Sequence, residues 1–495
     1  MTRPPTAPAH PGLAWQRLSP RMLLVHPVHE MLRQLPLLVG AVVLGSTTGN
    51  PLWTLAALAV TAALGVARWF TTSYRIDDDL DSGQVQLRSG VLQRKVLSVP
   101  RNRIRSVTTD ARPLHRLLGL TVLRVSTGQE AKGDNVFELD AVEADQVPRL
   151  RATLLAGSAE PAGAVSGPAA VPAVVLARWR PSWLRYSPLS LSGLVTIGAA
   201  VGLVYQSGVG AALQQSRLGQ AGLGTAERAG VAATVTVLAV VVLVASVVLA
   251  VLRSLLTYGN LVLSRRADVL QLRHGLLRVR EHTYDMARLR GGTLREPLLV
   301  RALGGARLDA VMTGVGGVGE SSVLLPPCPA DTAAAVLTGL VGDTAVVRGK
   351  LVGHGPAAAR RRWTRALVLP LAAGVLLAVL AAPGWVWLVW GLITVGAALL
   401  AADRVRALGH RVDADWLVAR TGSLQRRRDC IATAGIIAWT VRQSWFQRRA
   451  GVATLVAATA AGVKAYQVVD IPAAQAWAVA AQASPWVADS RWAVR

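Results

Sequence analysis

Long apolar runs separate stretches of this chain in which apolar and polar residues alternate over short distances. Five runs reach the about 17–25 residues that a membrane-spanning helix needs and contain no charged side chain: 51–67, 189–205, 231–252, 366–382 and 384–402. A sixth run, 35–48, is shorter, and by its length it also fits an interfacial or re-entrant segment. Its closeness to 51–67, across a turn at 46–50, favours a full span. We therefore predict six membrane helices in three hairpins.

The three stretches that follow the hairpins share a repeat. Gly90, Gly275 and Gly422 each stand 29 residues before a second glycine, Gly119, Gly304 or Gly451 (119 − 90 = 304 − 275 = 451 − 422 = 29). The surrounding sequences are similar: SGVLQRK…LHRLLGLTVLRV, HGLLRVR…LVRALGGARLDA and TGSLQRR…WFQRRAGVATLV. We expect the first glycine of each pair in a strand-to-strand turn with positive φ, because glycine lacks the β-carbon that disfavours it.

Each repeat combines short alternating runs with a final helical pattern. In the first repeat the runs 85–87, 91–99, 121–126 and 135–139 predict strands. The helical patterns are 141–155, 329–340 and 472–483, with Pro329 and Pro472 in the first turn, where proline is tolerated. Antiparallel strands covered by one helix predict a small barrel or an orthogonal sandwich. The predicted fold class is an α+β integral membrane protein, with six transmembrane helices in three hairpins, each followed by an antiparallel β-barrel capped by a C-terminal helix.

These patterns divide the chain into nine parts. They are an N-terminal tail (1–30), hairpin 1 (31–70), domain 1 (71–156), an Ala/Pro/Gly-rich linker (157–185), hairpin 2 (186–257), domain 2 (258–342), a basic linker (343–365), hairpin 3 (366–402), and domain 3 with the C-terminal tail (403–495).

Basic residues predict the orientation in the membrane. The turns 46–50 and 381–384 carry no charge, and the loop 206–230 carries only Arg217 and Arg228. In contrast, 70–187 holds 16 Lys and Arg, 253–365 holds 17, and 403–495 holds 13. We therefore expect a multi-pass membrane protein with both termini and all three repeats in the cytoplasm.

Composition narrows the function classes. The hydrophobic content of 52% and the mean hydropathy of +0.40 fit a membrane protein. The net charge of +25 raises the question of nucleic-acid binding, but 49 of the 53 basic residues are arginine in a chain dominated by Ala, Val, Leu and Gly. We read this as compositional bias and expect no nucleic-acid partner. Cys328 and Cys430 are too few for a disulfide framework or a zinc site, and the first 30 residues show no signal peptide.

Candidate chemistry is sparse. Residues 314–319 read GVGGVG and match the dinucleotide pattern GxGxxG, which needs a preceding strand and a following helix. Here a strand-like run follows, so we expect a flexible turn. Asp77, Asp78, Asp79 and Asp81 lack the later glutamate of a calcium loop. The eight histidines have no paired-ligand spacing. We expect no catalytic residue, no cofactor and no metal.

Arginine clusters are the features with functional potential. Near an anionic leaflet each basic side chain contributes about 1 kcal/mol. We expect weak contacts with anionic lipid headgroups or with a protein partner at Arg103, Arg105, Arg360, Arg361, Arg362, Arg426, Arg427 and Arg428. The alternatives are a solvated strand face for Arg103 and Arg105, and a specific ligand in place of lipid for the cluster 360–362.

The order of these parts resembles a known family. The segments VPRNRIRSV (99–107), LHRLLGL (114–120) and VSTG (125–128) are similar to the bacterial pleckstrin-homology (PH) domain of the second type. The segments REPLLVRALGG (295–305) and RQSWFQRRAGV (442–452) carry the same signature. The resemblance is to three-domain, six-span members and implies PH-like domains. In the third repeat 12 residues separate His410 from Gly422, against 16 from Tyr74 to Gly90, so its first hairpin is shortened and the completeness of that barrel is open.

Three function classes follow. The first is a non-enzymatic platform for interaction or assembly, through a protein partner or self-association, with envelope maintenance or resistance to membrane-active agents as its expected setting. The alternative is a component of a membrane transport or export system, although the apolar segments contain none of the ionisable residues that usually mark a transport path. The third, a membrane enzyme, lacks candidate acids, bases, nucleophiles and metal ligands.

Overall fold

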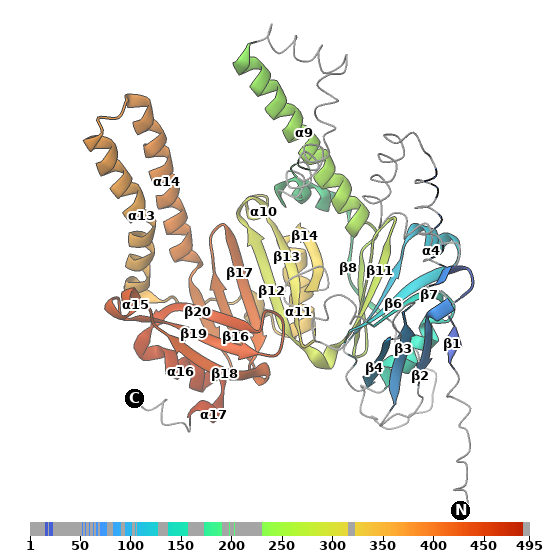
Figure 1. Cartoon of the computed structure of the whole chain (residues 1–495). Helices are drawn as coiled ribbons and strands as arrows, with labels where there is room; N and C mark the ends of the chain where they lie inside the picture. Colours follow the sequence, from blue (N-terminus) through green and yellow to red (C-terminus); the bar gives the residue numbers. More distant parts are fainter. Residues whose placement is uncertain are drawn as a thin grey trace, which may run out of the picture. The chain divides into compact units, whose positions relative to one another are not determined.

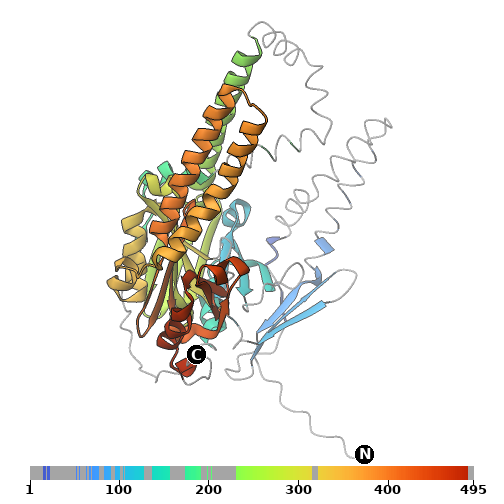
Figure 2. The same ribbon diagram turned by 90° about the vertical axis from the view of Figure 1, so that its left-hand side faces the viewer.

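A computed structural model describes residues 73–76, 83–90, 95–100, 106–126, 137–156, 173–190, 230–314 and 322–488, together with isolated positions and short pieces within 15–72 and at 104, 198 and 202. The chain divides into two compact units. Unit 1 comprises 1–175, 262–288 and 313–316, and unit 2 comprises 176–261, 289–312 and 317–495. The boundary therefore divides the predicted domain 2. We describe each unit separately (Figures 1 and 2).

The same order of elements occurs three times: three strands, a fourth strand, a short helix, two strands and a final helix. The first repeat has β2 (Ser73–Ile76), β3 (Gln84–Ser89), β4 (Lys95–Pro100), β5 (Ser106–Ala111), α4 (Pro113–Leu117), β6 (Leu120–Ser126), β7 (Phe137–Glu143) and α5 (Val147–Ala156). The second has β9 (Val262–Arg266), β10 (Val269–His274), β11 (Val279–Asp285), η4 (Met286–Arg288), β12 (Leu289–Pro297), α10 (Leu298–Ala302), β13 (Gly305–Met312), β14 (Val323–Pro329) and α11 (Ala330–Val341). The third has β15 (Gly409–Val412), β16 (Trp416–Thr421), β17 (Gln425–Ala432), η6 (Thr433–Gly435), β18 (Ile436–Arg442), α15 (Trp445–Arg449), β19 (Val452–Thr459), β20 (Ala465–Pro472), α16 (Ala473–Ala483) and α17 (Pro485–Ala488).

The paired glycines explain why the repeats keep this order. The predicted positive φ is confirmed for the first glycine of each pair, at 117° for Gly90, 106° for Gly275 and 96° for Gly422. The second glycines, with φ between 66° and 71°, each follow the short helix, where a left-handed residue commonly ends a helix. Pro329 and Pro472 differ from the prediction by one position, because they precede the first helical residue as N-caps. The third repeat contains all six strands, with its first hairpin shortened as predicted.

Sheet pairing connects consecutive repeats, which the sequence analysis did not predict. Sheet A has the order β1-β2-β3-β4, where β1 (Gln16–Arg17) comes from the predicted N-terminal tail. In unit 1, sheet B runs β7-β6-β5-β11-β10-β9, so the last strands of repeat 1 pair with the first strands of repeat 2 through β5 and β11. In unit 2, sheet C runs β14-β13-β12-β17-β16-β15, through β12 and β17, and sheet D runs β18-β19-β20.

The predicted closed barrels are therefore wrong for the strands that the structure describes. Within a repeat the fourth strand does not pair with the third. It pairs instead with the third strand of the next repeat, at β5–β11 and at β12–β17. The backbone groups on the outer side of each of these strands form hydrogen bonds with a strand of the neighbouring repeat. The sheet therefore continues into that repeat and does not close into a barrel. We call these two pairings junction 1 (β5–β11) and junction 2 (β12–β17).

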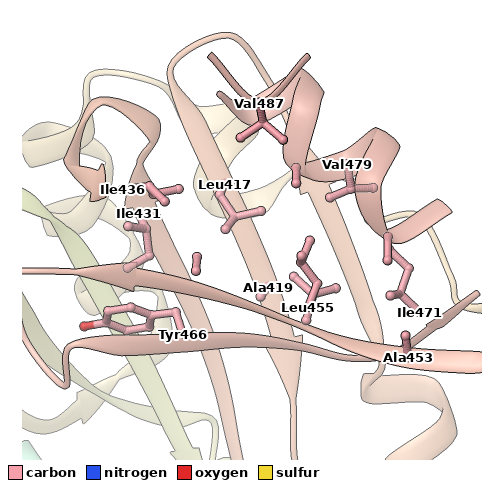
Figure 3. Packing of buried hydrophobic residues seen from close by; sticks show 14 of the residues in the cluster. Leu417, Ala419, Ile431, Ile436, Ala453, Leu455, Tyr466, Ile471, Val479 and Val487 are labelled. Carbon is pink, nitrogen blue, oxygen red and sulfur yellow. The ribbon is translucent and has the colours of Figure 1, made fainter. Parts of the chain in front are cut away.

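Each unit has an apolar core between two sheets and a helix. In unit 1 the core combines strands β2 to β7 with α5, and its fully buried side chains include Val85, Ile104, Leu123 and Leu154. In unit 2 the core of the third repeat combines β16 to β20 with α16. Figure 3 shows Leu417, Ile431 and Leu455 beneath the helices that carry Val479 and Val487. Close packing of these faces fixes which strand edges remain available.

Among the described residues, three helices are long and apolar enough to cross a membrane: α9 (Val231–Tyr258), α13 (Gly355–Val379) and α14 (Gly384–Ala407). Both views show α13 and α14 side by side as a hairpin (Figures 1 and 2). In it, Trp390 donates a hydrogen bond to the Pro370 carbonyl at 2.7 Å, and its ring packs on Gly374. The helices extend beyond the predicted runs, because α13 begins at Gly355 within the predicted basic linker. The predicted spans 35–48, 51–67 and 189–205 lie largely outside the described residues.

Candidate functional site

The arginines predicted to meet lipid or a partner occupy different environments. Arg103 and Arg105 lie outside the described residues. Arg360 is exposed on the first turns of α13. The neighbouring Arg361 and Arg362 instead face a carboxylate of the third repeat. Of the cluster 360–362, Arg360 is therefore the exposed side chain.

Asp470 on β20 holds Arg361 and Arg362. It is 1% exposed, and its carboxylate oxygens lie 3.0 Å from Arg361 Nε and 2.8 Å from an Arg362 Nη atom. Gln447 of α15 also donates a hydrogen bond to this carboxylate, at 2.9 Å. A buried carboxylate needs such partners, because an unpaired charge in the interior is costly. These contacts fix the start of α13 to β20.

The cluster 426–428 on β17 is also used within unit 2. Arg426 donates to Asp403 at 2.6 Å, and Asp403 accepts a second bond from Arg301 at 2.9 Å. Arg428 donates to two backbone carbonyls, of Val346 and Gly349, at 2.9 and 3.0 Å. Arg426 and Arg428 therefore act as internal donors between strand and helix segments.

Junction 1 contains a buried polar network that sequence reasoning missed. Asp110 on β5, 1% exposed, accepts hydrogen bonds from two nitrogens of Arg278, with the Nε bond at 2.6 Å. Burial raises the pKa of Asp110, but the hydrogen bonds and charge of Arg278 outweigh it, so that the pKa falls below its usual value. His282 Nδ1 on β11 lies 3.1 Å from Thr108 Oγ1. Burial, with the nearby His274 and Arg280, lowers the pKa of His282 to about 4.

Junction 2 is stabilised by a different set of groups. Asp309 on β13 accepts hydrogen bonds from Arg295 and Arg307. Asp429 on β17 accepts one from Thr293 Oγ1 at 2.8 Å and lies 3.3 Å from Arg427 Nε. Burial raises the pKa of Asp429 despite these partners. Charged residues at strand positions 110, 295, 309 and 429 were the sequence signal for both networks, since a charge at an apolar strand position requires a partner.

A histidine pair connects the two ends of the third hairpin. His354, the N-cap of α13, donates from Nδ1 to the Val469 carbonyl at 2.8 Å. Its Nε2 therefore accepts from Nδ1 of His410, 3.0 Å away. Both rings are buried. Burial lowers the pKa of both side chains, and with the neighbouring His354 it brings that of His410 to about 4. The pair is stable as two neutral rings.

Other candidate groups have structural environments or lie outside the described part. Burial raises the pKa of both Cys328 and Cys430 to about 12, which keeps the thiols protonated and unreactive. Of the GxGxxG segment only Gly314 is described, with φ 82°. The aspartates at 77–79 and 81 are outside the described residues. The buried polar groups described above thus stabilise the two junctions and the contact between α13 and β20. The outer edges of the end strands remain accessible.

Comparison with known families agrees with this arrangement. The family model described as "Bacterial PH domain" matches residues 32–158 and again residues 365–485, which together make up half of the chain. Each matched range begins in an apolar region and continues through one strand repeat. The middle repeat lies outside both ranges. No curated protein and no solved structure matches the chain.

Proposed function

The chain belongs to the bacterial PH domain family, and from this premise we propose that it is a non-enzymatic platform for assembly at the bacterial plasma membrane. In this proposal three cytoplasmic PH-like domains follow three membrane hairpins, with both termini in the cytoplasm. The platform would serve envelope maintenance or resistance to membrane-active agents. Neither catalysis nor nucleic-acid binding is part of the proposal.

The third hairpin supports the proposed topology. Arg361 and Arg362 fix the start of α13 to β20, and α14 ends at Ala407, two residues before β15 begins. Both ends of the hairpin therefore meet the same repeat, which supports a location of that repeat on one side of a membrane crossed by α13 and α14. The excess of Lys and Arg in the three repeat-containing regions supports the cytoplasm as that side. The exposed Arg360 stands where weak contact with anionic headgroups would add to anchoring.

One observation carries the assembly role: among the strands at the ends of the described sheets, two are of the kinds that pair between repeats. These strands are β4, an outer strand of sheet A, and β18, an outer strand of sheet D. Each exposes a large apolar side chain, Val96 at 51% and Ile437 at 67%. Edge strands recruit further strands through their backbone groups, which is a common mode of protein recognition.

Site-specific photocrosslinking in native membranes tests this role. A photoreactive amino acid replaces Val96 or Ile437, and two exposed positions away from the edges, Leu117 and Trp486, serve as controls. We expect discrete protein adducts from both edge positions and none from the controls. Adducts that are absent from both edges, or equally strong at the controls, would contradict the assembly role.

A further inference from the structure

Junctions 1 and 2 are built in the same way. Ala111 and Glu296 each stand 21 residues after the first glycine of their repeat (111 − 90 = 296 − 275 = 21), and Val279 and Arg426 each stand four after theirs (279 − 275 = 426 − 422 = 4). Ala111 is opposite Val279 in junction 1, and Glu296 is opposite Arg426 in junction 2. The fourth strand of one repeat thus pairs twice with the third strand of the next, antiparallel and in one register.

Two strands at sheet ends are of the same two kinds. β4 is a third strand, equivalent to β11 and β17, and β18 is a fourth strand, equivalent to β5 and β12. In the described residues each is an outer strand of its sheet. Thr440 is exposed and Val441 is half-buried, whereas their equivalents in β12, Thr293 and Leu294, are buried beside β17.

We propose that β18 of one chain pairs with β4 of a second copy, in the register of the two junctions. This inference rests on the proposed assembly function and names its partner. The register places Val441 opposite Val96, Thr440 opposite Leu97, Trp439 opposite Ser98 and Ala438 opposite Val99. The contact is head-to-tail, so repetition produces a ring if the rotation closes and an open chain if it does not.

A second copy fits these edges because the chain itself joins such strands twice. The same operation also preserves the side of the membrane, since in the proposed topology both junctions connect repeats that follow hairpins of one orientation. An unrelated partner would need a matching strand edge of its own. Every copy of this chain carries both complementary edges, β4 and β18, so the structure favours a second copy as the partner.

Charge in this register limits the strength of the contact. Arg442 falls opposite Lys95, and like charges directly opposite in a sheet are unfavourable. Junction 2 has the same arrangement, with Arg295 opposite Arg427. We therefore infer an association that is strengthened by removing one of the two like charges.

Charge reversal tests the partner and the register together. Two differently tagged full-length copies are co-expressed, solubilised in mild detergent and purified through one tag, and the recovery of the other is measured. We expect Arg442→Glu and Lys95→Glu to raise recovery at least threefold each, and the double variant to return to the wild-type level. Arg448→Glu, an exposed arginine on α15 away from the edge, serves as the matched control and should change nothing. Circular dichroism confirms that the exposed substitutions leave the fold intact.

A cysteine pair supplies the second measurement. Thr440→Cys in one tagged copy and Leu97→Cys in the other should form a disulfide between copies, because opposite residues in a sheet lie within disulfide reach. Unchanged recovery in the charge variants, or no disulfide between copies, would overturn the inference. If edge photocrosslinks then lead to a different protein, the assembly function stands and only the second-copy partner fails. If the edges give no adduct at all, both fail.

Discussion

The side chain of Arg361, near the start of helix α13, lies 3.0 Å from the carboxylate of Asp470, which is 1% exposed on strand β20. Arg362 contacts the other carboxylate oxygen at 2.8 Å. The sequence alone suggests that this basic cluster is a membrane anchor. Two of its three arginines instead connect a hairpin helix to the repeat that follows it.

Removal of this carboxylate should destabilise unit 2. Asp470→Asn leaves two partly buried guanidinium groups without their counter-charge, and breaking a buried ion pair costs about 3–5 kcal/mol. Asn also tolerates the positive φ of 57° at this position, so backbone strain does not confuse the result. The matched control is Asp413→Asn, whose pair with Arg411 is half-exposed and should contribute about 0–1 kcal/mol. Unfolding midpoints of the two variants in detergent should differ clearly; equal midpoints would contradict this role of Asp470.

Acid should weaken the contact around His354 and His410. The folded pKa of His410 is about 4, below the usual 6.5, so the unfolded chain binds more protons between these values. Stability therefore rises with pH through this window, by about 1.4 kcal/mol per pH unit for each group so shifted. His410→Gln removes one such group. Its free energy of unfolding should fall less than that of the wild type between pH 6.5 and 5, while His282 contributes equally to both. Parallel pH profiles would rule out this account.

Gly291 lies beside a bulge in the β12–β13 pairing and packs closely on β17 across junction 2. Its φ is 133°, which side chains rarely adopt, and an added β-carbon would collide with the Cys430 carbonyl oxygen on β17. Gly291→Ala should cost about 1–3 kcal/mol from backbone strain alone. Gly353 has open space around the same position and no positive φ, so Gly353→Ala is the control and should leave the unfolding midpoint nearly unchanged. A tolerated Gly291→Ala would show that junction 2 is looser than described.

Much of this fold could be predicted from the sequence. The two sets of glycines identified three equivalent repeats, because only a few turn geometries demand positive φ. The apolar runs identified the helices α9, α13 and α14. The junctions could not be predicted. Strand periodicity shows which face of β12 is buried, but it does not show which edge β12 pairs with, and β17 lies in another repeat. The arginines at 361, 362, 426 and 428 were predicted to contact lipid or a partner, because clustering in the sequence shows only that a segment is basic. It does not show the distant carboxylates of Asp403 and Asp470, or the backbone carbonyls, that bind these arginines.

The proposed topology has a direct test in intact cells. Single cysteines at Gly128 or Gly314, in a chain whose Cys328 and Cys430 are replaced by alanine, should be protected from a membrane-impermeant thiol reagent. A cysteine at Gln214, in the predicted outer loop, should react and serves as the positive control. The expectation follows from the basic residues of the repeat-containing regions, 13 to 17 in each. Labelling at Gly128 or Gly314 in unbroken cells would place the repeats on the wrong side.

The pairing of consecutive repeats is the central claim, and a disulfide across junction 1 tests it most directly. Val107 and Thr283 are opposite each other on β5 and β11, within the reach of a disulfide. Ala111 is four residues along β5, roughly 13 Å away at about 3.3 Å per residue. A protease site is placed in the linker 157–185, and the native cysteines are replaced by alanine. After cleavage under non-reducing conditions, the fragments of the Val107→Cys, Thr283→Cys chain should remain joined, and those of the Ala111→Cys, Thr283→Cys chain should separate. Fragments that separate in the first chain, or remain joined equally in both, would contradict the pairing.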